Sequence, residues 1–130
     1  MTPGTTLAWV AAGGALGALG RFLIGECVRV GTPLSGWTAV MTSNLVGTAM
    51  LAALGVAASA DALPPDPTAA WAFAATGFCG ALTTYSAFGL DTVLLWYEGR
   101  RTVALAQMGA TVAIGLATAE AIALRWGAGP

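Results

Sequence analysis

Four apolar stretches, each long enough to cross a lipid bilayer as a helix, dominate the 130-residue sequence. They lie at about residues 6–30, 37–59, 68–97 and 102–126. A helix rises about 1.5 Å per residue and the hydrocarbon core is about 30 Å thick, so one crossing needs roughly 20 residues. All six prolines fall at the termini or between these stretches, where a missing N–H does no harm. The sequence therefore predicts an all-α membrane protein with one transmembrane domain, residues 1–130.

Composition agrees with a lipid environment and argues against several function classes. Hydrophobic residues make up 57% of the chain and charged residues only 8%. Five basic residues, all arginine, form no basic patch, so no nucleic-acid partner is expected. Cys27 and Cys79 lack metal-ligand spacing and the chain has no histidine, so neither a disulfide nor a zinc site is indicated. Because no nucleophile–base pair or phosphate-binding loop is present, we expect no enzyme.

Small and polar residues in the first two spans predict helix contacts. Gly13 and Gly17 are one turn apart, and this spacing lets another backbone approach closely. Asn44 in the second span needs hydrogen-bonding partners in lipid. It either joins two helices or contacts a ligand, and the sequence favours neither alternative.

The fourth span carries one polar and small face, formed at helical spacing by Gln107, Thr111, Gly115 and Thr118. This face either lines a water-filled path or serves only helix packing. The second alternative is open because a threonine can return its hydroxyl to the carbonyl four residues earlier in its own helix.

The third span is the irregular one. As a single helix its 30 residues would be about 45 Å long and overshoot the hydrocarbon core. Residues that combine backbone freedom with competing hydroxyls cluster in its middle: Gly77, Gly80, Thr83, Thr84, Ser86 and Gly89. We therefore expect the third helix to break in mid-membrane, within residues 77–88. Such backbone must be buried in protein or line a cavity, and its freed carbonyls are natural cation ligands.

Three motifs now carry a resemblance to a known family. Residues 77–88, GFCGALTTYSAF, resemble the GFCGGxTTFSTF signature of the small fluoride channels of the CrcB or Fluc family. Residues 14–22, GALGALGRF, are similar to the family's GxxGAxxRY, and residues 43–48, SNLVGT, to its VNxxGT or VNxxGS. The similarity spans all four helices, in order and at family spacing.

The resemblance implies a channel that exports fluoride passively across the plasma membrane. It also implies an antiparallel dimer with two fluoride pathways along the subunit interface. A structural sodium ion at the dimer centre would be held by the backbone carbonyls of Gly80 and Thr83 from both subunits.

By position, Tyr85 and Phe88 match the two rings that face fluoride, Asn44 the pore asparagine, Arg21 the family's arginine, and Asp91 the site of a glutamate. Amide, hydroxyl and ring-edge donors suit fluoride, whose tightly held water a pore must replace. The arginine lies toward the end of its span, where it either reaches an aqueous vestibule or anchors the helix at the interface. The predicted fluoride pathway comprises Asn44, Tyr85, Phe88, Thr84, Ser86, Thr111, Gln107 and Arg21.

The chain departs from the family pattern inside the signature itself. Tyr85 stands where phenylalanine is usual, and Ala87 where the family has threonine. Asp91 shortens a carboxylate, and Gln107 stands where tyrosine is common. A non-conducting subunit is therefore one alternative function.

A small multidrug-type, proton-coupled transporter is the other alternative, because such proteins also have four spans and form antiparallel dimers. It needs a membrane-embedded carboxylate midway along the first span. Glu26 lies near the end of that span and Glu120 lies late in the fourth. Neither position fits well.

Basic residues are distributed unevenly between the two ends of the spans. Arg29, Arg100 and Arg101 flank the loops at one end, and Arg125 lies at the other. The positive-inside rule then favours both termini outside. A subunit that inserts in both orientations should be nearly unbiased, so a heterodimer with an oppositely oriented paralogue is an alternative to a homodimer.

Overall fold

The computed structural model describes residues 2–31, 36–60, 62–64 and 66–127, and every regular element in these ranges is a helix. Four helical stretches are long and apolar enough to cross a membrane: Pro3–Gly31, Gly36–Ser59, Pro67–Tyr97 and Arg101–Arg125. The prediction of an all-α fold with four spans is confirmed. The predicted bounds differ from these by three residues at most, at the start of the first span (residue 6 against residue 3).

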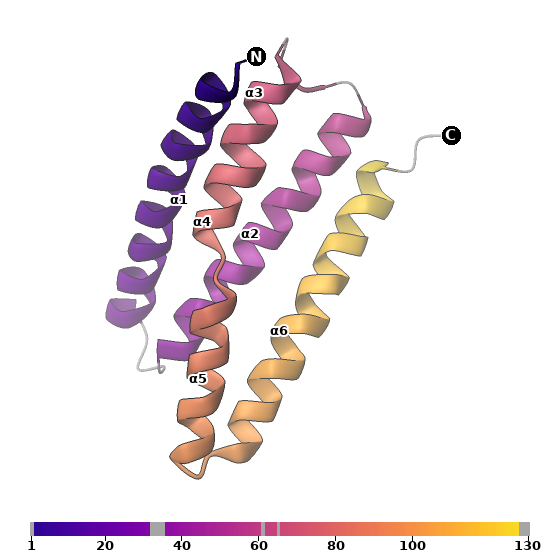
Figure 1. Ribbon diagram of the computed structural model, residues 1–130. Coiled ribbons are helices and arrows are strands. Elements are labelled where there is room, and N and C mark those ends of the chain that lie inside the picture. Colours follow the sequence, from indigo (N-terminus) through magenta and orange to yellow (C-terminus); the bar gives the residue numbers. More distant parts are fainter. Residues whose placement is uncertain (1, 32–35, 61, 65, 128–130) are drawn as a thin grey trace.

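The spans run alternately down and up the bundle (Figure 1). Helix α1 (Pro3–Gly31) descends and α2 (Gly36–Ser59) returns; the third span descends again, and α6 (Arg101–Ile122) ascends into the short π-helical η2 (Ala123–Gly127). The start of α1 and the end of α6 therefore lie at the same end of the bundle. In the view of Figure 1, α1 and α6 flank the third span on opposite sides.

The third span is built from several pieces. It contains α3 (Pro67–Trp71), the π-helical segment η1 (Ala72–Cys79), α4 (Gly80–Leu82) and α5 (Tyr85–Tyr97). Between α4 and α5 the backbone is extended at two residues, with φ/ψ of −83°/156° at Thr83 and −152°/119° at Thr84. The non-helical backbone is thus narrower than the predicted range 77–88.

The side chain of Thr84 explains where α5 begins. The Thr84 hydroxyl accepts a hydrogen bond from the Ala87 N–H at 3.2 Å, which satisfies one of the unpaired donors at a helix start. Asp66 does the same for α3, accepting from the Ala69 N–H at 3.0 Å. Polar side chains therefore define the starts of α3 and α5.

Glycines bring α1 and η1 into backbone contact. A Cβ on Gly13 would overlap the carbonyl oxygen of Phe73, and a Cβ on Gly17 would overlap that of Phe78. The predicted helix contact through Gly13 and Gly17 is confirmed. Gly77 faces them, since its Cβ would lie 2.6 Å from a carbonyl oxygen of α1. Gly77 is helical, so close approach rather than backbone freedom is the reason for glycine there.

A tight turn reverses the chain between α5 and α6. Gly99 has a φ of 77°, which glycine adopts without steric penalty. The Arg100 N–H donates to the Leu95 carbonyl at 2.9 Å and the Gly99 N–H to the Trp96 carbonyl at 3.1 Å. These are the two bonds of a Schellman motif. The turn places α6 antiparallel to α5 (Figure 1).

Candidate functional site

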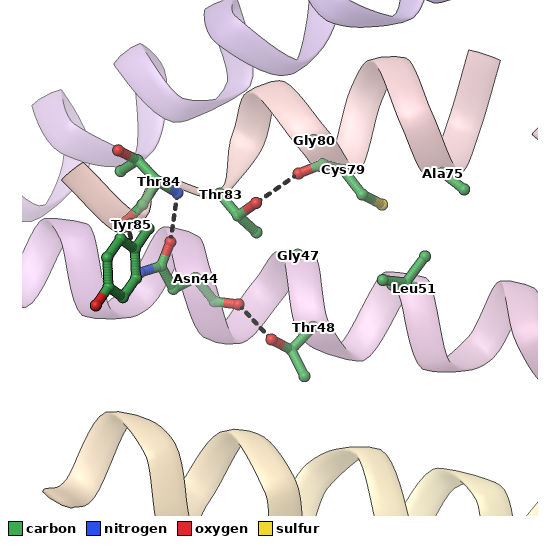
Figure 2. Close-up of a pocket in the computed structure, with 10 residues that line it drawn as sticks. All are labelled: Asn44, Gly47, Thr48, Leu51, Ala75, Cys79, Gly80, Thr83, Thr84 and Tyr85. Atoms are coloured by element: carbon green, nitrogen blue, oxygen red, sulfur yellow. Dashed lines mark hydrogen bonds between the residues drawn. The ribbon is translucent and has the colours of Figure 1, made fainter. Parts of the chain in front are cut away.

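Asn44 binds the third span at its break. Its Oδ1 accepts a hydrogen bond from the Thr84 N–H at 2.8 Å, and its Nδ2 donates to the Thr84 carbonyl at 3.1 Å (Figure 2). Asn44 therefore joins two helices, the first of the two predicted alternatives. An amide nitrogen carries two N–H groups, and this pairing uses one of them. The second N–H has no hydrogen-bond partner among the described residues.

A cavity of about 400 Å³ lies between α2 and the third span. Figure 2 shows residues of α2 along one side of it and residues of η1, α4 and the break along the other. It is lined by Asn44, Gly47, Thr48, Leu51, Ala75, Cys79, Gly80, Thr83, Thr84 and Tyr85. Both predicted carbonyl ligands, Gly80 and Thr83, thus lie in the same cavity as Asn44 and Tyr85.

The break frees backbone carbonyls at this cavity. The N–H and the hydroxyl of Thr83 both donate to the Cys79 carbonyl, at 3.0 and 2.9 Å. The Thr84 N–H goes to Asn44. Within the described part of the chain, no hydrogen bond reaches the carbonyl oxygens of Gly80 or Thr83. Unpaired carbonyls of an unwound segment are the ligands that sodium takes in membrane proteins, so these two residues fit such an ion.

A second cavity, of about 310 Å³, lies where α2, α5 and α6 meet. Asn44, Thr48 and Tyr85 line both cavities and therefore lie between them. Tyr85 and Phe88 have ring centroids 6.1 Å apart, inclined at 41°. The second cavity is lined by Asn44, Thr48, Tyr85, Phe88, Thr111, Val112, Gly115, Leu116 and Ala119.

Thr111 differs from the hydroxyl residues around it. Thr48 and Thr92 return their hydroxyls to carbonyls of their own helices, at 2.8 and 2.9 Å. The buried Thr111 hydroxyl has no hydrogen-bond partner among the described residues. The alternative that an α6 threonine hydroxyl donates to a carbonyl of its own helix is therefore wrong for Thr111. A buried, unpartnered hydroxyl costs about 1–3 kcal/mol, which a ligand or water in the cavity would relieve.

Gln107 lies one turn earlier on the same face of α6 and is only 2% exposed. Neither its Oε1 nor its Nε2 has a partner among the described residues, and the buried indole N–H of Trp37 also has none. Both residues line a third cavity, of about 410 Å³. No site role is predicted for Trp37 from the sequence, because a tryptophan near a span end is typical of the membrane interface.

Besides Gln107, two predicted pathway residues lie outside the two cavities around Tyr85. Arg21 is exposed on α1, and Ser86 is exposed at the start of α5. Neither lines either of the two cavities around Tyr85. The Ser86 hydroxyl lies 3.2 Å from that of Thr84. Asp91 has a buried carboxylate oxygen without a described partner, and it lines neither cavity.

The carboxylate of the first span is engaged in an ion pair. Arg29 Nη2 lies 2.6 Å from Glu26 Oε2, and Arg29 Nε lies 3.2 Å from both carboxylate oxygens. Glu120 is exposed on α6. Neither residue is a free carboxylate in a central cavity, which argues against the transporter alternative.

The helices and cavities together define a multi-pass membrane protein whose third span is interrupted beside cavities that contain a few polar side chains. The family model for CrcB-like proteins, described as "CrcB-like protein, Camphor Resistance (CrcB)", matches residues 8–123, and the chain belongs to this family. The resemblance inferred from the three motifs is confirmed.

Several relatives carry a functional name. Fluoride-specific ion channel FluC 2 of Symbiobacterium thermophilum is 37% identical over 125 residues, which cover 92% of this chain and 98% of the relative. FluC 1 of Nocardia farcinica is 41% identical over 111 residues, or 82% of this chain and 70% of the relative. FluC of Vibrio cholerae is 39% identical over 111 residues, covering 82% and 79%.

Proposed function

We propose that this chain is a subunit of a fluoride-selective ion channel in the plasma membrane, which exports fluoride passively and lowers its cytoplasmic concentration. The observation that carries the proposal is the match to relatives named fluoride-specific ion channels along 82–92% of the chain. The cavities around Tyr85 support it independently, because they bring together most of the residues assigned to the pathway from sequence.

The chemistry of the second cavity suits a small, strongly hydrated anion. The Asn44 amide has a second N–H, the Thr111 hydroxyl has no protein partner, and the rings of Tyr85 and Phe88 offer positive edges. These donors can replace the water of fluoride. Among the described residues, no arginine or lysine lines the cavity, so an anion would not be held too tightly to leave.

The pathway then follows α6 past the break. Fluoride would pass Gln107 and Thr111, meet Phe88, Tyr85 and Asn44, and continue along the hydroxyls of Thr84 and Ser86. Arg21 would act from an aqueous vestibule, where a positive charge raises the local anion concentration.

An antiparallel dimer would close the pathway against lipid. Tyr85 is 87% exposed in the single chain although it lines both cavities. A second subunit would cover it. The partner is either another copy of this chain or an oppositely oriented paralogue. Accessibility tags on both termini decide: equal inside and outside populations support the homodimer, and one orientation supports the heterodimer.

A structural sodium ion at the centre of this dimer would be held by the carbonyls of Gly80 and Thr83 from each subunit. When bound, it would supply a fixed positive charge and cross-link the two breaks. The unpaired state of both carbonyls supports this assignment.

A non-conducting subunit is the second candidate, favoured by Tyr85 and Ala87 in the signature. Fluoride efflux from proteoliposomes distinguishes the two and tests the site. We expect wild-type efflux, a marked fall in Phe88→Ile, which removes a ring edge, and a fall in Asn44→Asp, which places negative charge beside an anion. Efflux unchanged by both substitutions would contradict the site assignment.

A further inference from the structure

We propose that Asn44 is a positioning residue that creates the cation site, because it removes the hydrogen-bond donor that would otherwise close the Gly80 carbonyl. The inference rests on the proposed function, since it concerns the sodium ion assigned to the same channel. It assigns Asn44 a role beyond contact with fluoride.

Helix geometry identifies the missing bond. In an unbroken α-helix the N–H of each residue donates to the carbonyl four residues earlier, so Thr84 would donate to Gly80. The Thr84 N–H instead donates to Asn44 Oδ1 at 2.8 Å. The Thr84 N–H is therefore bound by Asn44, which lies 40 positions away in sequence, and is not available to Gly80. The lone pairs of the Gly80 carbonyl oxygen remain free for another ligand.

The second half of the amide fixes the conformation of the break. Asn44 Nδ2 donates to the Thr84 carbonyl, so Asn44 binds both polar groups of the Thr84 backbone. Thr84 has a φ of −152° and caps α5 through its hydroxyl. Thr83 caps the end of α4 and Thr84 caps the start of α5, so these two residues separate the two helical segments. Gly80 is helical, so the interruption does not arise from glycine at that position.

Gly47, one turn after Asn44 in α2, allows the Asn44 side chain to reach the break in the third span. A Cβ on Gly47 would overlap the Thr83 side chain, so glycine is needed for α2 to lie this close to the break. The Thr48 hydroxyl returns to the Asn44 carbonyl at 2.8 Å and does not compete for the Asn44 side chain. Of similar side chains, only asparagine offers both an acceptor and a donor at this reach, because aspartate lacks the donor and leucine lacks both.

Sodium binding by the purified, full-length channel tests the inference without measuring flux. The readout is the sodium-dependent rise in thermal unfolding temperature in detergent, against N-methylglucamine at equal ionic strength. The sodium concentration giving half the effect should rise about 10–100-fold in Asn44→Leu, as is usual when a residue that orients metal ligands is removed. It should rise less in Asn44→Asp, which keeps the acceptor for the Thr84 N–H.

The matched control is Thr42→Val on the same helix, because the Thr42 hydroxyl donates to the Thr38 carbonyl at 2.8 Å and has no other partner among the described residues. It should bind sodium like the wild type. Wild-type sodium affinity in Asn44→Leu, or no sodium effect in the wild type, would overturn the inference. Fluoride efflux by the wild type is a separate measurement, so the proposed channel can stand when this inference fails.

Amide hydrogen exchange in the wild type keeps the inference testable if Asn44→Leu does not fold. Thr84 lies outside any helix, yet its N–H is predicted to exchange slowly because Asn44 holds it. The neighbouring N–H of Tyr85, at the uncapped first position of α5, is predicted to exchange faster. Fast exchange at Thr84 would contradict the proposed role of Asn44.

Discussion

The third span has two contrasting faces. Toward α1, glycines allow backbone-to-backbone contact at Gly13, Gly17 and Gly77. Toward α2 and α6, the span meets cavities and buried polar groups that lack partners, such as the Thr111 hydroxyl. Two tasks are therefore divided between the faces: the α1 face holds the span in place, and the other face carries the polar groups to which we assign contact with ions.

The division has an energetic reason. Each buried polar group without a partner costs about 1–3 kcal/mol, so a helix bundle that contains several of them needs firm support elsewhere. Close packing through small residues supplies that support in lipid, where the hydrophobic effect does not drive helix association. Substitutions on the two faces should therefore change stability and transport in different ways.

The largest effect is expected on the α1 face. Gly17→Val would place side-chain atoms inside the backbone of Phe78, and should destabilise the fold by about 3 kcal/mol or abolish it. The measurement is the folded yield and thermal unfolding in detergent. Gly25→Val on the same helix is the control, because a Cβ there meets nothing within 4 Å. Equal behaviour of the two variants would refute the close contact.

On the face toward α2 and α6, a substitution should reduce transport without reducing stability. Thr111→Val keeps the shape but removes an unpartnered hydroxyl, so stability should stay the same or rise by about 1–3 kcal/mol while fluoride efflux falls about tenfold. Unfolding and efflux are measured on one preparation. Thr118→Val, one residue before the cavity-lining Ala119 and outside the cavity lining itself, should leave efflux nearly unchanged. A loss of stability in Thr111→Val would show that its hydroxyl has a partner.

Gln107→Leu applies the same reasoning at the third cavity. Replacement of a fully buried amide without partners should raise the free energy of unfolding by about 1–2 kcal/mol. Chemical denaturation in mixed micelles measures it. Gln107→Glu is the comparison variant and should destabilise, since it adds a buried charge. If Gln107→Leu is less stable than the wild type, the Gln107 amide must have a hydrogen-bond partner.

The smallest effect is expected away from both faces, at the turn between α5 and α6. Gly99→Ala forces a positive φ on a residue with a Cβ and should cost about 1 kcal/mol. Gly109→Ala in the helix α6 should instead stabilise by about 0.5–1 kcal/mol, since a Cβ there meets nothing within 4 Å. The paired shifts in unfolding temperature test the turn, and shifts of the same sign would contradict it.

Local patterns predict part of this molecule well. Hydropathy and proline positions define the four spans because both are properties of neighbouring residues. The Gly13–Gly17 spacing predicts a helix contact, since it describes one helix face. The narrow break is less predictable: residues 72–79 stay helical as a π-helix, and only Thr83 and Thr84 become extended.

Tertiary partners account for what sequence patterns miss. Asn44 pairs with Thr84, 40 positions away, and no local signal identifies that partner. Thr48 and Thr111 sit in similar helical contexts, yet one hydroxyl returns to its own helix and the other has no described partner. From the sequence, Trp37 is typical of the membrane interface. In the structure its indole N–H is buried, and Trp37 lines the same cavity as Gln107.

We propose above that fluoride passes selectively along the face of the third span that lies toward α2 and α6. The most direct test reconstitutes the wild-type chain in liposomes loaded with equal fluoride and chloride, and follows both ions with selective electrodes after a potassium ionophore is added. We expect rapid release of fluoride while chloride is retained. Release of both ions at equal rates, or no fluoride release from this chain either alone or with an oppositely oriented paralogue, would contradict this role.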